Sequence, residues 1–330
     1  MGGDHGPPET VPAVLRILRK RPEVDITLVG REASLTPLLE GQDYPAGRLH
    51  IVHAPEVVEM HELPSAALRT KKQSSMRRAI EMVKEGQVQA CVSAGNTGAL
   101  MAMARHVLKM LPGVDRPAIC ATVPGINGRT HILDLGANVD STADHLFQFA
   151  VMGSELASAV EGVPEPTVAL LNVGAEEIKG NEVVRKAAAL LSASHLNYAG
   201  FVEGNDMYAG KVDVIVCDGF TGNIALKASE GVAHYISHHA KTEFGRSLYG
   251  RFAALLCMPV LKAIRKRVDP RRYNGASLLG LRGIVIKSHG SADRISFANA
   301  IEEALLEVEQ NVPERIASRL EVVLAQGQAV

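Results

Sequence analysis

The feature that most constrains the fold is the alternation of short apolar runs with longer helical patterns. Many of the short runs are apolar at every position, which is typical of strands buried on both faces of a parallel sheet. Strands separated by helices form right-handed βαβ units, so we predict an α/β protein with a doubly wound, mostly parallel sheet. The expected strands are 25–29, 49–52, 88–92, 118–123, 131–135, 167–172, 212–217 and 284–287. The expected helices among them are 12–20, 75–84, 97–110, 143–159 and 182–191.

The last third of the chain is more helical than the rest. Residues 292–310 and 313–325 both read as amphipathic helices. The chain has 330 residues, of which 46% are hydrophobic, and no low-complexity linker divides it. A chain of this size and composition can bury a large core. We therefore expect one domain of two lobes that spans residues 1–330.

Charge and residue usage exclude some classes of partner. The formal net charge is -1, aromatic residues make up 4% and tryptophan is absent, so we expect no nucleic-acid partner. The four cysteines (91, 120, 217 and 257) form no C-x-x-C pair and are interpreted as reduced core thiols of a cytoplasmic protein. No secretory signal opens the chain. The longest strongly apolar run, 253–261, is far shorter than the roughly 20 residues of a membrane span.

Five expected strands end in small, polar loops that contain glycine: 93–98, 134–138, 172–176, 218–223 and 288–293. The carboxyl ends of parallel strands line the ligand crevice of an α/β sheet. Glycine lets backbone N–H groups approach a ligand, and a helix N-terminus favours an anion. The same residue types also serve ordinary turns and helix caps. The two interpretations are evenly balanced, and the functional one predicts an oxyanion or phosphate site.

Familiar catalytic motifs are missing from the sequence. There is no G-x-G-x-x-G after a strand, no P-loop, no H-E-x-x-H and no G-x-S-x-G. We therefore expect no cofactor, no metal and no covalent nucleophile, which suits a reaction whose substrate brings its own nucleophile. Lys179 follows the third loop and could place a point charge on phosphate, although it could equally be an ordinary surface lysine.

The opening Met1-Gly2-Gly3-Asp4 resembles the start of the bacterial phosphate acyltransferases of phospholipid synthesis. Further stretches are similar to the signatures of that family, in the same order: SAGNTGALMA (93–102), LDLGANVD (133–140), NVGAEEIKGN (172–181), CDGFTGNIALKASEG (217–231) and GIVIKSHGSAD (283–293). The resemblance covers nearly the whole chain.

This resemblance implies a catalytic domain that transfers a fatty acyl group from acyl-carrier protein to inorganic phosphate. It also implies a fold similar to the isopropylmalate dehydrogenases and phosphate acetyltransferases, without NAD, and a homodimer. The acyl-phosphate product would serve a membrane glycerol-3-phosphate acyltransferase. Members of the family usually carry a short apolar strand ahead of the Met-Gly-Gly-Asp motif, so we expect the sheet to lack this strand.

Within this scheme each loop receives a role. We assign Lys179 to phosphate and to charge balance, Asn223 to the thioester carbonyl oxygen, and His289 as a possible proton donor to the leaving thiolate, with a structural histidine as the alternative. The expected phosphate-binding residues are Gly95, Asn96, Thr97, Gly98, Asn138 and Gly222. The expected substrate-binding residues are Gly3, Asp4, Asp218 and Gly219.

A basic amphipathic segment spans residues 246–272. It contains eight arginines or lysines and one acid, Asp269. We predict that it binds an anionic membrane surface peripherally, with Pro259 kinking or splitting the helix. The alternative is a helix packed on the core with a basic solvated face. The expected membrane-contacting residues are Phe252, Leu255, Leu256, Arg265 and Lys266.

Three other functions remain open. A metal- and NAD-dependent decarboxylating dehydrogenase on a related fold would need a metal site, for which Asp134, Asp140 and Asp144 are the candidates. The second is phosphate acetyltransferase activity on acetyl-CoA. The third is a non-catalytic regulator that binds acyl-carrier protein.

Overall fold

The computed structural model describes residues 1–327, apart from the side chains of residues 46, 265, 266, 268, 270 and 324–327. Its helices are α1 (Pro7–Lys20), α2 (Glu32–Leu39), η1 (Ala46–Arg48), α3 (Pro64–Thr70), α4 (Ser75–Lys84), α5 (Thr97–Leu108), α6 (Ala143–Glu161), α7 (Glu182–Ser192), η2 (Gly204–Tyr208), α8 (Gly219–Gly245), α9 (Leu248–Val268), η3 (Pro270–Tyr273), α10 (Arg294–Glu309) and α11 (Val312–Gly327). Its strands are β1 (Ile26–Gly30), β2 (Leu49–His53), β3 (Ala90–Ser93), β4 (Ala118–Gly125), β5 (Gly128–Leu133), β6 (Val168–Leu171), β7 (Tyr198–Val202), β8 (Val214–Val216), β9 (Ala276–Leu279) and β10 (Ile284–Lys287).

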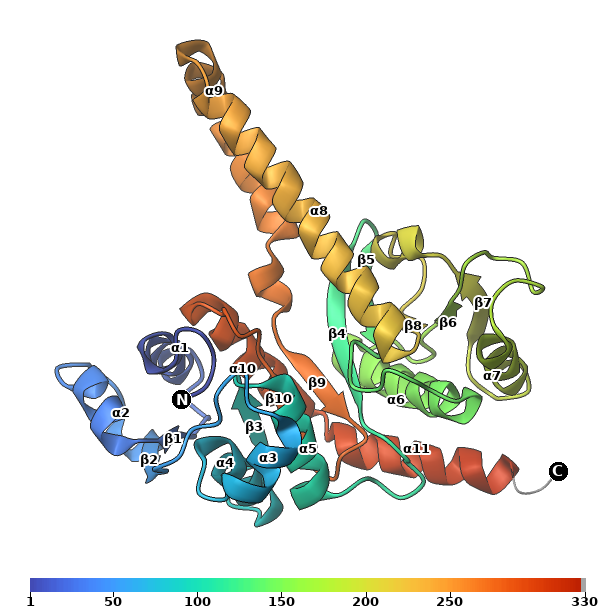
Figure 1. Ribbon diagram of the computed structural model, residues 1–330, viewed down its shortest axis with the longest axis horizontal. Coiled ribbons are helices and arrows are strands. Elements are labelled where there is room, and N and C mark those ends of the chain that lie inside the picture. The colour runs from blue at the N-terminus through green and yellow to red at the C-terminus, as the bar shows by residue number, and fades with distance from the viewer. Residues whose placement is uncertain (328–330) are drawn as a thin grey trace.

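An eight-stranded sheet runs through the molecule in the order β3-β10-β9-β4-β5-β8-β6-β7 (Figure 1). The β3–β10, β5–β8, β8–β6 and β6–β7 pairs are parallel. The three pairs in the middle, β10–β9, β9–β4 and β4–β5, are antiparallel. The prediction of an α/β fold with a mostly parallel sheet is confirmed, and we interpret the chain as two lobes that share this sheet.

The antiparallel middle corrects one expectation about the loops. Because three successive pairings are antiparallel, β5, β8 and β6 run opposite to β3 and β10. The five glycine loops therefore do not share one edge of the sheet. They form two groups, one after β3 and β10, and one after β5, β6 and β8.

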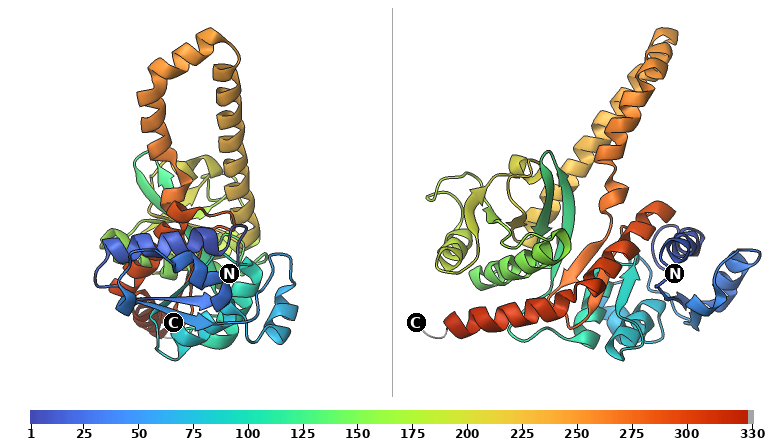
Figure 2. Two further views of the ribbon diagram at one scale, coloured as in Figure 1. Left: turned by 90° about the vertical axis from the view of Figure 1, so that its left-hand side faces the viewer. Right: turned by 180° about the vertical axis from the view of Figure 1, so that it is seen from behind.

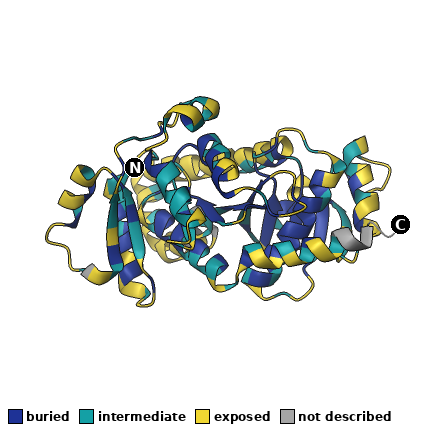
Figure 3. Ribbon diagram, turned by 90° about the horizontal axis from the view of Figure 1, so that it is seen from below, coloured by how far each residue is buried: buried dark blue, intermediate teal, exposed yellow. Residues whose placement is uncertain are grey.

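The helices cover both faces of the sheet and bury it (Figure 3). On β8, Val214 and Val216 pack toward α6 and α11, whereas Ile215 belongs to the cluster on the other face, against which Leu226 of α8 packs. In the other lobe, Val285 of β10 packs against α4 and α5, and Ile286 packs against α10. Strands that are buried on both faces explain why these runs are apolar at every position.

Helices α8 and α9 form a hairpin that projects far from the body (Figures 1 and 2). The chain bends by 120° between the two helices. The sharp break between them lies after Gly245, not at Pro259, which stands inside α9. Figure 2 shows that α9 first crosses the tip and then turns back toward the body, a bend for which an internal proline is a common cause. Within residues 1–327 no single helix is long and apolar enough to cross a membrane, but α8 and α9 together pass that test as a bent pair.

Strands β1 and β2 form a separate parallel sheet at the N-terminal side. A cavity of about 630 Å³ lies between residues 25–29 of this sheet and residues 88–94 around β3. Met1 and Gly2 line the same cavity, beside the carboxyl ends of both strands: a Cβ on Gly30 would contact Met1, and one on Gly2 would lie 2.6 Å from Gly95 Cα. A strand leading into Met1 would thus run parallel to both neighbours.

We expect that an apolar, strand-forming segment fused before Met1 will raise the melting temperature. It would pair with the free edges of β1 and β3 and bury apolar area, which contributes roughly 25 cal/mol per Å². Differential scanning calorimetry of the fused and unfused chains measures the effect. A fusion of equal length made of Gly and Ser is the control. Equal melting temperatures for all three proteins would show that the cavity accepts no strand.

Candidate active site

The first group of loops brings the N-terminal residues together with the ends of β3 and β10. The Asp4 amide donates to the carbonyl oxygen of Gly290 at 2.8 Å, and the Ser288 amide donates to that of Ser93 at 2.9 Å. Gly3 has φ of 88°, and a Cβ there would lie 3.0 Å from the Gly290 oxygen. Glycine is therefore required where these loops approach.

The second group of loops surrounds the start of α8. The Gly219 amide donates to the Asn138 carbonyl oxygen at 2.8 Å. A Cβ on Gly222 would lie 2.0 Å from the Asp134 carbonyl oxygen, so only glycine lets α8 approach this loop. Asn223 follows, exposed, beside Gly136. Within the described residues the side-chain amide of Asn223 has no hydrogen bond, so this group is available to a ligand.

Lys179 lies in the loop after β6, at the same edge as Asn223. Its side chain is exposed, and its stem passes over Gly174, where a Cβ would lie 3.1 Å from Lys179 Cγ. Among the described side chains no carboxylate lies within ion-pair distance of Lys179. An ammonium without a counter-ion beside a glycine loop suits an anionic ligand.

Two of the expected phosphate ligands use their side chains to build the loops. Asn96 caps α5 by accepting the Ala99 amide at 3.1 Å, and its Nδ2 donates to main-chain oxygens of residues 59, 60 and 62. Asn138 Nδ2 donates to Pro117 O at 2.8 Å and to Asp134 Oδ2 at 3.0 Å. For both side chains the structural interpretation is the better one. At the start of α5 the main-chain amides of Thr97 and Gly98 have no partner within the helix, so they remain available to a ligand.

The loop before α8 is similarly occupied by its own contacts. Asp218 caps the helix through the Thr221 amide and hydroxyl, at 2.8 Å each. The Gly222 amide donates to the Asp218 carbonyl oxygen at 3.0 Å. The Gly219 amide is bonded as well. Asp218, Gly219 and Gly222 therefore shape the start of α8, and the side chain of Asn223 is the exposed hydrogen-bond donor there.

Helix α8 connects the two groups of loops. Asn223 and Lys227 are four residues apart, so they share a face of the helix about 6 Å apart along its axis. Lys227 interacts electrostatically with Lys287 and His289 of the first group. The face of α8 that carries Asn223 therefore reaches both groups.

Lys287 was missed by the sequence analysis. It ends β10 and is only 8% exposed, and its Nζ donates to Ala94 O at 3.4 Å and contacts Ser288 O. Burial lowers the pKa of Lys287 to about 8, with Asp4 opposing this shift and Lys227 adding to it. The available signal was a lysine that closes the apolar run Ile284-Val285-Ile286 directly before a glycine loop.

His289 lies two residues after Lys287, in the loop that follows β10. Burial, followed by the charge of Lys227, lowers the pKa of His289, so its ring is neutral at pH 7. Nδ1 accepts the Ser291 amide at 3.2 Å and lies 2.8 Å from Ser291 Oγ. This contact assigns the proton to Nε2, which can donate a hydrogen bond.

The aspartates of the dehydrogenase alternative do not form a metal site. Asp134 is fully buried, and its carboxylate accepts the amides of Ile119, Ala137 and Asn138 at 2.9, 3.0 and 2.6 Å. Burial raises the pKa of Asp134 although these bonds oppose the shift. In residues 1–327 no group of three or more His, Cys, Asp or Glu side chains is placed to hold a metal ion.

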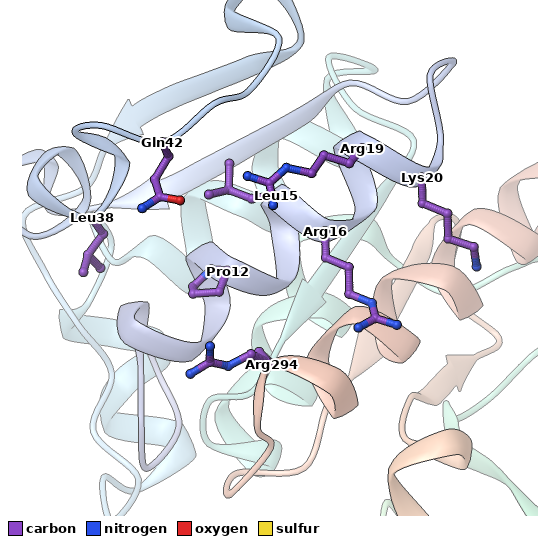
Figure 4. A pocket seen from close by; sticks show the side chains of 8 residues that line it. All are labelled: Pro12, Leu15, Arg16, Arg19, Lys20, Leu38, Gln42 and Arg294. Carbon is purple, nitrogen blue, oxygen red and sulfur yellow. The ribbon is translucent and has the colours of Figure 1, made fainter.

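A basic hollow of about 710 Å³ lies between α1, α2 and the start of α10 (Figure 4). Its lining includes Arg16, Arg19, Lys20 and Arg294. Two of these cations are already paired, Lys20 with Glu302 at 2.7 Å and Arg294 with Glu9 at 3.1 Å. The hollow holds none of the predicted site residues.

The fold is that of the phosphotransacylases. A phosphotransacetylase from Streptococcus pyogenes aligns with a TM-score of 0.61 at 16% identity, over 91% of this chain and 90% of its own. A branched-chain phosphotransacylase from Enterococcus faecalis aligns with a TM-score of 0.59 at 14% identity, over 94% and 97%. At such low identities these likenesses show the fold alone. The predicted likeness to phosphate acetyltransferase folds is confirmed.

Sequence comparison defines the family. A family model described as fatty acid synthesis protein matches residues 1–315. A phosphate acyltransferase of Methylococcus capsulatus is 61% identical over 98% of this chain and 96% of its own length. One from Nitrosococcus oceani is 57% identical over 100% and 97%. The chain belongs to this family of acyltransferases, as the resemblance implied.

Proposed function

We propose that the chain transfers a fatty acyl group from acyl-carrier protein to inorganic phosphate, giving acyl-phosphate for phospholipid synthesis. The observation that carries this proposal concerns the chain after β6 and after β8, at the same edge of the sheet. Among the described residues, Lys179 there has no carboxylate in ion-pair distance and the Asn223 side chain has no hydrogen bond. Relatives at 57–61% identity are named phosphate acyltransferases, which supports phosphate as the acceptor.

In this proposal phosphate attacks the thioester carbonyl directly. The site must hold an oxyanion about 3 Å from the carbonyl carbon and stabilise the charge that develops on the carbonyl oxygen. Lys179 balances the negative charge that develops in the transition state. Asn223 donates a hydrogen bond to the carbonyl oxygen. The amides of Thr97 and Gly98, in the first group of loops, are further donors that we propose for the phosphate.

The leaving group is the thiolate of the carrier. His289 is neutral and carries its proton on Nε2, so it can donate a hydrogen bond to the departing sulfur and need not release a full proton. The Asp4 amide bonds to the same loop, Gly3 approaches it closely, and both would border the substrate. This mechanism requires no group on the protein to become acylated.

The donor is tested by measuring carrier release. The carrier protein loaded with a fatty acyl group, the corresponding acyl-CoA and acetyl-CoA are each incubated with the enzyme, with and without phosphate. The release of free thiol is measured. We expect phosphate-dependent release from the carrier protein at a much higher kcat/KM than from the CoA thioester. Preference for acetyl-CoA would assign phosphate acetyltransferase activity instead. Binding of the carrier without release would indicate a regulator.

We also propose that the α8–α9 hairpin mediates association with a second copy and with a membrane. Large apolar side chains are exposed on both helices: Val232, Tyr235 and Ile236 on α8, and Phe252, Leu255 and Leu256 on α9. Large exposed apolar patches mark sites of protein or membrane interaction. The side chains of Arg265 and Lys266 lie outside the described residues. Sedimentation velocity of wild type and Tyr235→Glu tests the dimer, which the variant should weaken.

A further inference from the structure

Lys287 is a buried cation without a carboxylate partner. The described residues place no Asp or Glu oxygen within 4.0 Å of its Nζ, and the contacts it makes are to main-chain oxygens. A buried charge is costly unless something neutralises it. Its ammonium lies beside the loops that contain Asp4, Ala94 and Ser288, and each of these loops also contains glycine, which lets a ligand approach the backbone closely.

The titratable groups around Lys287 and His289 lie on three elements. Asp4 projects from the N-terminal loop, is exposed, and interacts electrostatically with Lys287. Lys227 and Glu230 project from α8 and pair with each other at 2.7 Å. His289 is neutral. Within this cluster, Asp4 is the acid that is exposed and makes no ion pair with a described cation.

An acid beside an anion site has a specific use. Phosphate at neutral pH still carries a proton on one oxygen, which can donate a hydrogen bond to a carboxylate. Sulfate carries no such proton, and neither does the phosphodiester of a pantetheine arm. A site with one cation and one carboxylate therefore accepts phosphate and repels both of the others.

We propose that Lys287 and Asp4 form the subsite that binds inorganic phosphate, with Lys287 supplying positive charge and Asp4 accepting the proton of the bound oxyanion. This inference rests on the proposed function and deepens it, because it separates phosphate binding from transition-state stabilisation. Lys227 adds positive charge from α8, four residues beyond Asn223. Phosphate held here lies beside the face of α8 on which the acyl carbonyl is proposed to bind.

If Lys287 binds phosphate and Lys179 stabilises the transition state, their loss should affect different kinetic constants. Loss of Lys287 should raise the KM for phosphate about ten- to a hundredfold, which is the range for one hydrogen bond to a charged group, with a smaller change in kcat. Loss of Lys179 should act mainly on kcat. Above a pH of about 8 Lys287 loses its charge, so the phosphate affinity of the wild type should fall there.

The test is calorimetric titration of inorganic phosphate and of sulfate, without acyl donor, into the wild type, Lys287→Met, Asp4→Asn and Lys179→Met. We expect the wild type to bind phosphate and reject sulfate, and Lys287→Met to lose phosphate binding at an unchanged melting temperature. Asp4→Asn, an exposed change that leaves packing intact, should bind sulfate. Lys179→Met should keep most of its phosphate affinity.

Three outcomes overturn the inference. These are normal phosphate binding by Lys287→Met, rejection of sulfate by Asp4→Asn, and no phosphate binding by the wild type. The first of these, combined with lost binding in Lys179→Met, would move the subsite to Lys179 and leave the proposed function intact. The proposed function itself fails if phosphate does not promote carrier release from the wild-type enzyme, which is a separate measurement.

Discussion

Replacing Asn223 with alanine is expected to lower turnover about 10²–10³-fold, and replacing Lys179 with alanine at least about tenfold. Asn223 is exposed beside Gly136, and its amide is free to donate to the oxyanion. Lys179 has no neighbouring carboxylate to neutralise it. Neither side chain supports the core, so both variants should melt at the wild-type temperature. Steady-state carrier release gives the measurement.

Lys186→Ala is the matched control for the lysine. Lys186 lies on the adjacent helix α7 and pairs at 2.7 Å with Glu182, with both side chains largely exposed. Surface pairs of this kind contribute little, so turnover should not change. Wild-type kinetics in Asn223→Ala or Lys179→Ala would remove that residue from the mechanism.

Replacing Leu255 with glutamate is expected to abolish binding to anionic vesicles while acyl transfer in solution survives. Leu255 is 66% exposed on α9, and the α8–α9 hairpin projects away from the body (Figure 2). Basic residues contribute on the order of 1 kcal/mol each near an anionic surface, and salt screens them. An apolar face adds burial in the interface, and a buried carboxylate opposes it.

Vesicle sedimentation measures this effect. The wild type should bind anionic vesicles, bind zwitterionic ones poorly, and dissociate as salt is raised. Ile126→Glu is the control, because Ile126 is 86% exposed in the β4–β5 turn, on a different element. Equal binding of the wild type to both kinds of vesicle, or binding to neither, would assign the apolar face of α9 to protein packing.

Elements with a strong period were predictable from the sequence. Residues 75–84 and 284–287 form α4 and β10 with the expected bounds. The antiparallel β4–β5 hairpin and β9 were missed. A signal for the hairpin was present, because Gly125-Ile126-Asn127-Gly128 lies between two apolar runs, and glycine with asparagine marks a tight turn. Missing it placed all five loops at one edge of the sheet.

The site was only partly predictable, because the same residue types cap helices and bind ligands. Asn96 and Asn138 lie in the expected loops, but their side-chain Nδ2 groups donate to main-chain oxygens. Lys287 gave no periodic signal, since a lysine at a strand end usually lies in solvent; its burial depends on loops distant in sequence. Cys257, expected in the core, is exposed on α9, which projects from the body of the molecule.

The central claim is that phosphate attacks the thioester directly, without an acyl-enzyme. The most direct measurement incubates the enzyme with acyl-carrier protein labelled in the acyl chain, first without phosphate, and analyses the denatured protein by mass. The account predicts an unlabelled enzyme, and acyl-phosphate formation in a single step once phosphate is added. A stable stoichiometric acyl adduct on the enzyme before phosphate is added would contradict it.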